Sequence, residues 1–524
     1  MHNNRGEQKA SLKPFKAQEL TMLKQNYSFL IFLGISFLHL NILLGNISAE
    51  VTSENSLDEK LIVIVIPSYN NKQWYAQNLE KVLSQNYRNF YVIYTDDCSP
   101  DGTGDLVEEY LKEYDTEHKV QLIKNPYRRG ALHNLYTMIH MCPDNAIVAT
   151  LDGDDWFPDD EVLHRLNMIY SSNQVWLTYG QFQLHPSGNR GWATTMPDYI
   201  VENNAFRDFQ HLPTHLRTFY AWLFKRIKLQ DLLYLGKFYP MTWDMAMMFP
   251  MIEMAGERHQ FIADIMYIYN DANSISDHHV SRQLQAYLAQ IIKKKPRYKR
   301  LSEKPTKQRP SSKRMKADMI IFAESPDKLT QLIQSLYTHV TGVDKLFVMY
   351  KPRSVYEKND YITLQLSYPE IEFCLIADYR SNFRTALFEI YQKTHHKYII
   401  FAKGDTCFEK SVSLTECINA LEETQAYAFY FKLNAQNAEE QYQHLPIVEC
   451  RNSIFAWNFA LAPDKWSAAN SLDLVLHKKT DSLKQALQSH YDLTPNGLEA
   501  IWANEGNLDR LGLCFNENHI RIIN

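Results

Sequence analysis

The sequence predicts an α/β fold with two domains, each built on a mainly parallel sheet flanked by helices. Two observations carry this prediction. From residue 61 onward, short apolar runs rich in Val and Ile alternate with stretches of helical periodicity, which is typical of parallel strands covered on both faces. The alternation stops at a basic stretch, 293–316, and then resumes. A length of 524 residues, 45% of them hydrophobic, suffices for two such cores.

Four strands are expected in the first domain, at 61–66, 91–95, 120–123 and 146–151, and three helices alternate with them, at 74–85, 106–114 and 132–141. The first strand is a continuous β-branched run, which indicates burial on both faces. Polar clusters at 67–70, 96–103 and 152–155 come directly after three of these strands. Because ligands bind at the carboxyl ends of the strands in such sheets, we expect these clusters to form the functional site.

Charge is unevenly distributed along the chain. The formal net charge is −5, but residues 293–316 hold twelve Lys or Arg, three Pro and a single acid, Glu303. Without that stretch, 43 basic and 59 acidic residues remain, so no nucleic-acid partner is expected. The stretch itself lacks hydrophobic periodicity and predicts an extended linker. It is either a solvated spacer or a segment that binds an anionic membrane surface or another polyanion.

The N-terminus predicts a membrane-related segment. Residues 1–28 carry five basic and two acidic side chains, and a 17-residue apolar run follows at 29–45. As a helix this run is about 26 Å long, slightly short of a bilayer core of about 30 Å. A signal anchor over 29–49, a cleaved signal peptide ending near Ala49 and a buried core helix remain open. The charge bias places the following domains away from the cytoplasm. We therefore expect a membrane-associated protein with one N-terminal anchor, or a protein exported after cleavage.

The second domain, 317–524, is expected to be a divergent duplication of the first. Residues 398–405 parallel 146–154 at an offset of about 251. At that offset the acids Asp152, Asp154 and Asp155 become Lys403, Asp405 and Thr406. One carboxylate beside a lysine is a poor site for a divalent cation, so we expect this domain to bind none and to lack the chemistry of the first. We expect Lys403 to pair with Asp405, and Glu499 is the one candidate for a remnant base.

Three carboxylates lie within four residues at the end of the fourth strand: Asp152, Asp154 and Asp155. Such a cluster repels itself unless a cation or basic groups compensate it, and its oxygens suit Mg²⁺ or Mn²⁺ held jointly with phosphates. The alternative is an acidic turn that leads into a helix capped by Asp159 or Asp160. An EF-hand is excluded, because Phe157 stands where the calcium loop needs glycine.

Four motifs in order carry a resemblance to a known family. They are 66–70 (Ile-Pro-Ser-Tyr-Asn), 96–103 (Asp-Asp-Cys-Ser-Pro-Asp-Gly-Thr), 129–134 (Arg-Gly-Ala-Leu-His-Asn) and 151–155 (Leu-Asp-Gly-Asp-Asp). Together they resemble the signatures of the family 2 inverting glycosyltransferases with the GT-A fold. The resemblance implies a catalytic GT-A domain over 60–292 and a degenerate GT-A-like domain over 317–524. It further implies a nucleotide-sugar donor, a UDP-sugar, and a glycan, lipid or protein acceptor.

The resemblance also implies roles for individual donor-binding residues. In this family the loop after the first strand and the second aspartate of the next motif hold the uridine, which points here to Pro67, Tyr69 and Asp97. Arg129, from the third motif, is implied as a further contact to the donor.

A metal ion, Mn²⁺ or Mg²⁺, is implied at the Asp-x-Asp element. In this sequence the element is Asp152 and Asp154, and Asp152 also contacts the donor's ribose and diphosphate. His278 or His279 lies in a segment that resembles the closing loop of some such enzymes, and one of them is a candidate to complete the metal shell. Adjacent histidines are more often simply exposed.

The family's catalytic base is an acid about 90 residues past that element, near the start of a helix. Asp244, 92 residues after Asp152, fits this position, and Glu253 is the alternative. Asp244 can also be read as a helix cap. Arg217 is a candidate contact to the acceptor or diphosphate, or equally a buried structural arginine.

Two other functions compete with this interpretation. A nucleotidyltransferase would need a glycine-rich, basic loop after the first strand, and 67–72 (Pro-Ser-Tyr-Asn-Asn-Lys) is neither. A non-catalytic, membrane-tethered binding protein fits the second domain but not the first, whose acids are intact. The seven scattered cysteines form no CxxC pair, which argues against a zinc ribbon and a disulfide framework.

Overall fold

The computed structural model describes residues 59–523, except 173, 210–212, 274–280, 305–314, 378, 443–444, 452, 468–470, 472 and 489–508. Lys60–Asn524 forms one compact unit. The predicted anchor or signal peptide at 29–49 lies outside the described residues. Among the helices that are described, none is both long enough and apolar enough to cross a bilayer.

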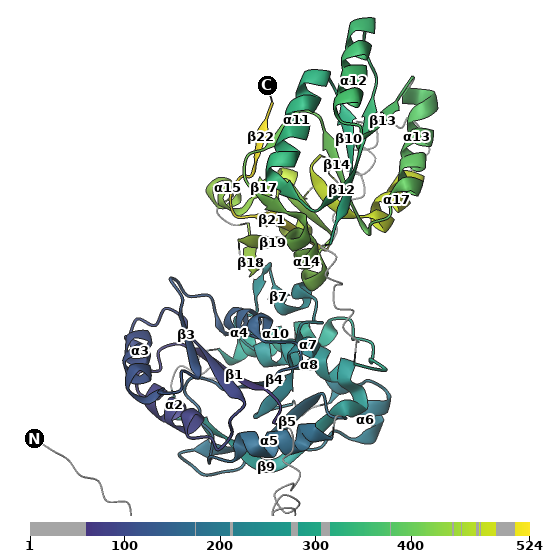
Figure 1. The fold of residues 1–524 in the computed structure, drawn as a ribbon. Coiled ribbons are helices and arrows are strands. Elements are labelled where there is room, and N and C mark those ends of the chain that lie inside the picture. The colour runs from purple at the N-terminus through teal and green to yellow at the C-terminus, as the bar shows by residue number, and fades with distance from the viewer. Residues whose placement is uncertain are drawn as a thin grey trace, which may run out of the picture. The chain divides into compact units, whose positions relative to one another are not determined.

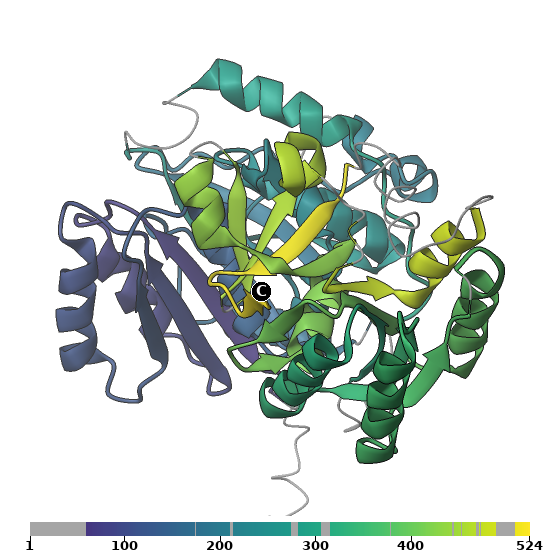
Figure 2. The same ribbon diagram turned by 90° about the horizontal axis from the view of Figure 1, so that it is seen from above.

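The first domain contains a seven-stranded sheet with the order β3-β2-β1-β4-β6-β5-β9. Its strands, purple to teal in Figures 1 and 2, are β1 (Ile62–Ser68), β2 (Phe90–Asp96), β3 (Val120–Lys124), β4 (Ile147–Thr150), β5 (Leu177–His185), β6 (Arg217–Tyr220) and β9 (His259–Asn270). The four predicted strands are present and parallel, and β6 is antiparallel to both β4 and β5. Every side chain from Ile62 to Ile66 is fully buried, as a doubly covered central strand requires.

Helices connect the strands much as the sequence predicts. The expected ones are α2 (Tyr75–Leu83), α3 (Thr103–Tyr114) and α4 (Ala131–Met141), and further ones are α5 (Val162–Ser171), α6 (Asp198–Glu202), α7 (Ala221–Phe224), α8 (Trp243–Ala255) and α10 (Arg282–Lys294). A short hairpin, β7 (Leu233–Tyr234) and β8 (Lys237–Phe238), precedes α8. Eleven residues of α8, from Met245 to Ala255, are buried, so this helix is part of the core.

Part of the basic stretch belongs to the first domain rather than to an extended linker. The Leu301 amide donates to the Met254 carbonyl of α8 at 2.9 Å, and Arg258 donates to the Ser302 carbonyl at 2.8 Å. Hydrogen bonds to its main-chain groups therefore hold the segment up to residue 302 on the domain. The prediction of a linker from residue 293 was wrong here. It rested on side-chain charge, which does not reveal that α8 accepts a hydrogen bond from the backbone of this segment.

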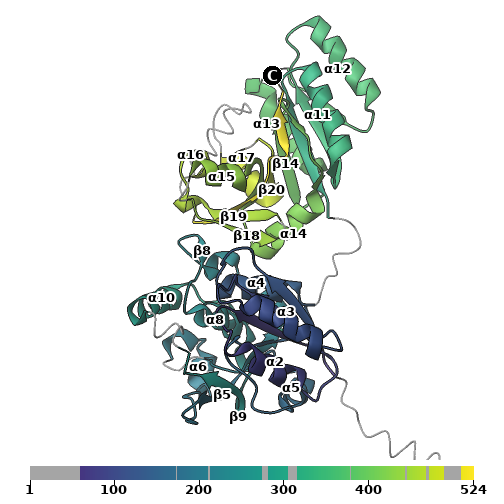
Figure 3. The same cartoon turned by 90° about the vertical axis from the view of Figure 1, so that its left-hand side faces the viewer.

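The second domain contains a nine-stranded sheet with the order β13-β12-β10-β14-β20-β17-β21-β19-β18. Its strands are β10 (Ala317–Ala323), β12 (Val343–Tyr350), β13 (Glu372–Leu375), β14 (Tyr398–Lys403), β17 (Ala428–Asn434), β18 (Ile447–Arg451), β19 (Ile454–Asn458), β20 (Val475–Lys478) and β21 (Leu511–Phe515). The helices are α11 (Pro326–His339), α12 (Val355–Ser367), α13 (Tyr379–Lys393), α14 (Leu414–Thr424), α15 (Ala435–Gln441), α16 (Asp464–Ser467) and α17 (Lys479–Gln488). Helices α11 and α12 lie side by side (Figures 1 and 3).

The second sheet repeats the topology of the first. Reading β13, β12, β10, β14, β20, β17 and β21 for β3, β2, β1, β4, β6, β5 and β9 gives the same strand order. The directions also agree: β14 is antiparallel to β20, as β4 is to β6, and β17 is parallel to β21, as β5 is to β9. Strands β19 and β18 extend this sheet beyond β21. The two domains therefore share one fold.

Candidate active site

The carboxyl ends of β1, β2 and β4 bring the polar clusters of the first domain together. The Asp97 amide donates to the Ser68 carbonyl at 2.9 Å, and the Gly153 amide donates to the Pro67 carbonyl at 3.2 Å. These bonds continue the parallel ladders past the strand ends and tie three loops to one another. The expected meeting of the clusters at this edge of the sheet is therefore observed.

The turn after β4 is held in place from two sides. On one side, the side-chain amide of Asn78 in α2 donates to the backbone carbonyls of Asp152, at 3.1 Å, and Asp155, at 2.7 Å. On the other side, the Tyr267 hydroxyl of β9 accepts from the Asp152 amide at 3.2 Å and donates to Asp155 Oδ2 at 2.6 Å. The Asn270 amide adds a 2.7 Å bond to Asp155 Oδ1. This turn is thus fixed independently of any ligand.

The three carboxylates of this turn are electrostatically unfavourable as they stand. Burial raises the pKa of Asp152, and the nearby Arg217 guanidinium opposes that shift. Burial and the neighbouring Asp152 raise the pKa of Asp154 to about 6. Burial and both neighbouring carboxyls raise the pKa of Asp155 well above its ordinary value. Raised values of this kind mark a cluster whose charge a cation would stabilise.

Sequence reasoning missed His215. Its Nε2 lies 3.7 Å from Asp152 Oδ2, and ligand atoms of Asp152, Asp155 and His215 all lie within 4.8 Å of one another. Burial and the Arg217 guanidinium lower the pKa of His215 well below its ordinary value, which favours the neutral imidazole. The signal that would have found it is the antiparallel pairing of β6 with β4, which places the residues before Arg217 beside the acidic turn. His278 and His279 lie outside the described residues.

Arg217 and Asp244 form the second part of the site. Arg217 is 4% exposed at the start of β6, and its Nη2 lies 3.2 Å from Asp244 Oδ2. Its guanidinium also lies 5.5 Å from the centre of the Trp243 ring. Asp244 is partly exposed in the first turn of α8, and its Oδ1 accepts a bond from the next amide, that of Met245. Arg217 Nε and Nη1 are buried without a hydrogen-bond partner in the described structure.

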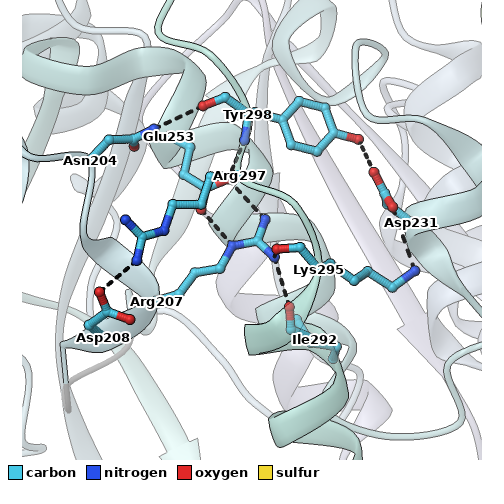
Figure 4. A network of polar contacts seen from close by, with 9 residues as sticks. All are labelled: Asn204, Arg207, Asp208, Asp231, Glu253, Ile292, Lys295, Arg297 and Tyr298. Carbon is cyan, nitrogen blue, oxygen red and sulfur yellow. Dashed lines mark hydrogen bonds and ion pairs between the residues drawn. The ribbon is translucent and has the colours of Figure 1, made fainter.

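Glu253, the alternative base, is a structural residue. It is fully buried, and both of its oxygens accept bonds from the Arg207 guanidinium, at 2.5 and 2.9 Å. Figure 4 shows how Arg207 in turn donates to the carbonyls of Ile292 and Lys295, while the Tyr298 amide donates to Glu253. A carboxylate enclosed in this way cannot reach an acceptor hydroxyl.

The predicted nucleobase residues lie together but contact their own domain. The Arg128 guanidinium lies 3.8 Å from the centre of the Tyr69 ring. The Asp97 carboxylate accepts bonds of 2.8 Å from the amides of Arg129 and Gly130 and from the Asn125 side chain. It therefore fixes the loop that carries the third motif.

Arg129 itself makes an ion pair with the second domain. Its Nη1 lies 2.9 Å from Glu449 Oε2 of β18. The backbone amide of Arg129 points to Asp97, while the side chain points to Glu449. Its implied contact to the donor remains a prediction.

The corresponding edge of the second domain holds a lysine other than the predicted one. Lys432 of β17 forms an ion pair with Asp473, and its Nζ lies 3.9 Å from Asp405 Oδ1. Strand pairing that the sequence did not reveal brings β17 to this edge. The expected pairing of Lys403 with Asp405 stays a prediction. Glu499 lies outside the described residues.

Similarity to known proteins agrees with this geometry. The chain is 27% identical over 152 residues to the UDP-Glc:alpha-D-GlcNAc-diphosphoundecaprenol beta-1,3-glucosyltransferase WfgD of Escherichia coli. The aligned region covers 29% of this chain and 57% of WfgD. It is 29% identical over 109 residues to the putative teichuronic acid biosynthesis glycosyltransferase TuaG of Bacillus subtilis. This aligned region covers 21% of this chain and 42% of TuaG. The chain thus spans about half the length of the curated relatives it matches.

Solved structures with partial similarity include TarS of S. aureus in complex with UDP-GlcNAc. That match has a TM-score of 0.34 and 15% identity, and it covers 44% of this chain and 65% of that chain. The mannosyltransferase PcManGT of Pyrobaculum calidifontis, in complex with GDP-Man and Mn²⁺, has a TM-score of 0.32 and 17% identity over 51% and 76% of the two chains. The family model described as Glycosyl transferase family 2 matches residues 63–233. The chain therefore contains, over residues 63–233, a domain that belongs to glycosyl transferase family 2.

Proposed function

We propose that this protein transfers a sugar from a UDP-linked donor to an acceptor hydroxyl in a metal-dependent, inverting reaction. The observation that carries the proposal is the half-buried acidic turn at Asp152, which lies beside the Arg217–Asp244 pair. The two parts supply what a single displacement needs: a place for a charged diphosphate and a separate carboxylate. The name of the relative WfgD, which specifies a UDP-Glc donor, supports the choice of nucleotide.

The nucleotide is proposed to bind over the carboxyl ends of β1 and β2. Pro67 and Tyr69 provide an apolar surface and an aromatic ring for the nucleobase, and Asp97 directly follows the neighbouring strand β2. The Arg128 guanidinium, which covers Tyr69 here, and the Arg129 guanidinium supply positive charge near the phosphates.

A divalent cation, Mn²⁺ or Mg²⁺, fits the acidic turn. Asp152 and Asp154 are the proposed ligands, and His278 is a further candidate from the sequence. The raised pKa values of these two acids and the oxygen-rich donor set are what such a cation would compensate. When bound, the cation neutralises charge that develops on the leaving nucleoside diphosphate.

Asp244 is the proposed base. Its carboxylate is partly exposed, unlike that of Glu253, and Arg217 fixes its orientation. It takes the proton of the acceptor hydroxyl as the oxygen attacks the anomeric carbon on the face opposite the leaving group. One displacement inverts the anomeric configuration and needs no enzyme nucleophile.

The acceptor is proposed to be a glycan, lipid or protein hydroxyl. WfgD is named for a lipid-linked acceptor, a diphosphoundecaprenol, and TuaG for teichuronic acid biosynthesis. Either kind of acceptor is compatible with the membrane association that we propose for residues 29–49, through an anchor or before export.

A panel of nucleotide sugars tests this proposal. The full chain is incubated with UDP-, GDP- and dTDP-sugars in Mn²⁺ or in EDTA, and released nucleoside diphosphate is measured. We expect release from one or a few UDP-sugars in Mn²⁺ only. Equal release in EDTA would contradict the metal dependence, and release only from a GDP- or dTDP-sugar would contradict the assigned nucleotide.

A further inference from the structure

We propose that His215 is a nitrogen ligand of the divalent cation, together with Asp152 and Asp155, so that Asp155 adds a carboxylate to the ligands Asp152 and Asp154 proposed above. This inference rests on the proposed function and identifies a ligand that none of the four sequence motifs contains. The three side chains come from the turn after β4 and from the residues that precede β6, so two separate segments would hold the ion. Their ligand atoms lie within 4.8 Å of one another.

His215 is positioned as a ligand before any ion binds. It is 8% exposed, its ring stacks on Tyr267 at a centroid distance of 4.4 Å, and Phe182 packs against it edge-on at 5.8 Å. Tyr267 also binds the acidic turn through its hydroxyl, so one residue orients the imidazole and the carboxylates together.

The ring nitrogens of His215 lack hydrogen-bond partners among the described residues. Nδ1 is buried and unpaired, and Nε2 lies 3.7 Å from Asp152 Oδ2, which is too long for a hydrogen bond. Buried polar nitrogens are nearly always satisfied in proteins, so an unpaired imidazole beside two carboxylates indicates a missing partner. A cation that accepts both nitrogen and oxygen ligands, as Mn²⁺ does, would bind the ring nitrogen that faces the carboxylates and compensate their charge.

The second domain supplies an independent comparison, because the strand registers align the two sites. Gly153 donates to the carbonyl of the β1 residue Pro67, and Gly404 donates likewise to Phe322 of β10. Three residues before each glycine, Thr150 pairs with Arg217 and Phe401 pairs with Val475. Counting two residues back from these partners makes Asp473 the counterpart of His215.

At this counterpart position the second domain holds a cation of its own. The Lys432 ammonium forms an ion pair with Asp473 and lies 3.9 Å from Asp405, the counterpart of Asp154. Lys432 comes from β17, and the equivalent strand of the first domain, β5, contains no Lys or Arg. The same place in the fold is thus filled by a lysine of β17 in one domain, whereas β5 supplies no Lys or Arg side chain to the acids and His215 of the other. This difference points to a metal ion at His215.

Pulsed electron paramagnetic resonance on the full chain loaded with Mn²⁺ alone tests the inference. We expect a nitrogen coupling on the bound Mn²⁺ that disappears in His215→Gln, together with a dissociation constant raised on the order of tenfold or more. His215→Ala provides a second variant if the glutamine protein is unstable. His164→Gln, on the exposed side of α5, is the matched control and should leave coupling and affinity unchanged.

Two other outcomes separate this inference from the proposed function. Mn²⁺ that binds without nitrogen coupling, or a coupling that persists in His215→Gln and is lost in His278→Gln or His279→Gln, would overturn the role of His215 and leave the metal dependence intact. No Mn²⁺ binding, with sugar transfer unchanged in EDTA, would overturn both.

Discussion

Arg217 Nη2 lies 3.2 Å from Asp244 Oδ2, and this ion pair connects the sheet to the first turn of α8. The same guanidinium acts electrostatically on the other part of the site: it opposes the upward pKa shift of Asp152 and lowers the pKa of His215. One buried cation is therefore shared between the proposed metal site and the proposed base. The two parts of the site are coupled through it.

Replacing Asp244 with Asn should abolish proton abstraction while leaving donor binding nearly intact. Asn keeps the size of the side chain and can still bond to Arg217, but it has no basicity. We expect kcat to fall on the order of 10²-fold or more, with little change in UDP affinity. Steady-state kinetics and calorimetric titration with UDP check this. Full activity in Asp244→Asn would show that the base has been misassigned.

The pKa of Asp154 predicts how stability depends on pH without metal. Burial and Asp152 raise this pKa from 3.8 to about 6, so between these values the folded protein holds a proton that the unfolded chain has released. Stability contributed by the protonated form is therefore lost as the pH rises through that window. Asp154→Asn should raise Tm at pH 7 and have little effect at pH 4.

Thermal denaturation of both proteins in EDTA across pH 4 to 8 measures this difference. Saturating Mn²⁺ should reduce it at pH 7, because the cation stabilises the carboxylate, and Mn²⁺ affinity of the wild-type chain should fall below about pH 6. A Tm difference that does not depend on pH would contradict this interpretation of Asp154.

The Glu253–Arg207 pair predicts a loss of stability rather than of chemistry. Removing one partner leaves an uncompensated buried charge, so Glu253→Gln should lower the free energy of unfolding by about 3 to 5 kcal/mol. Glu257, which pairs with Arg300 at 3.1 Å near the surface, is the matched control, and Glu257→Gln should cost about 1 kcal/mol or less. Chemical denaturation measures both. If Glu253→Gln folds with normal stability and kcat collapses, Glu253 is the base.

The sequence predicted the parallel part of the first sheet well because its signals are local. The β-branched run at the first strand and the polar clusters after the strands need no knowledge of distant contacts. What it missed depends on pairing between distant segments. The antiparallel strand β6 brings His215 to the acidic turn, and β17 brings Lys432 to Asp473. The enclosure of Glu253 by Arg207 likewise joins residues that are 46 positions apart.

The ion pair of Lys432 predicts that the full chain binds one metal–nucleotide complex. In the second domain the Lys432 ammonium already lies beside the carboxylates of Asp405 and Asp473. Because it neutralises part of their negative charge, these acids attract Mn²⁺ weakly. Calorimetric titration of the full chain with UDP in Mn²⁺ should give one site per chain, and Asp152→Asn should remove it. A second site that persists in Asp152→Asn would show that the second domain also binds a donor.

The most direct test of the central claim is the rate of UDP release by Asp152→Asn at saturating Mn²⁺ and UDP-sugar, compared with the wild-type chain. Asp152 belongs to the acidic turn that directly follows β4, which the sequence motifs and the described structure both identify. The account predicts a loss on the order of 10²-fold or more with an unchanged fold by circular dichroism. An undiminished rate would show that the reaction does not depend on this site.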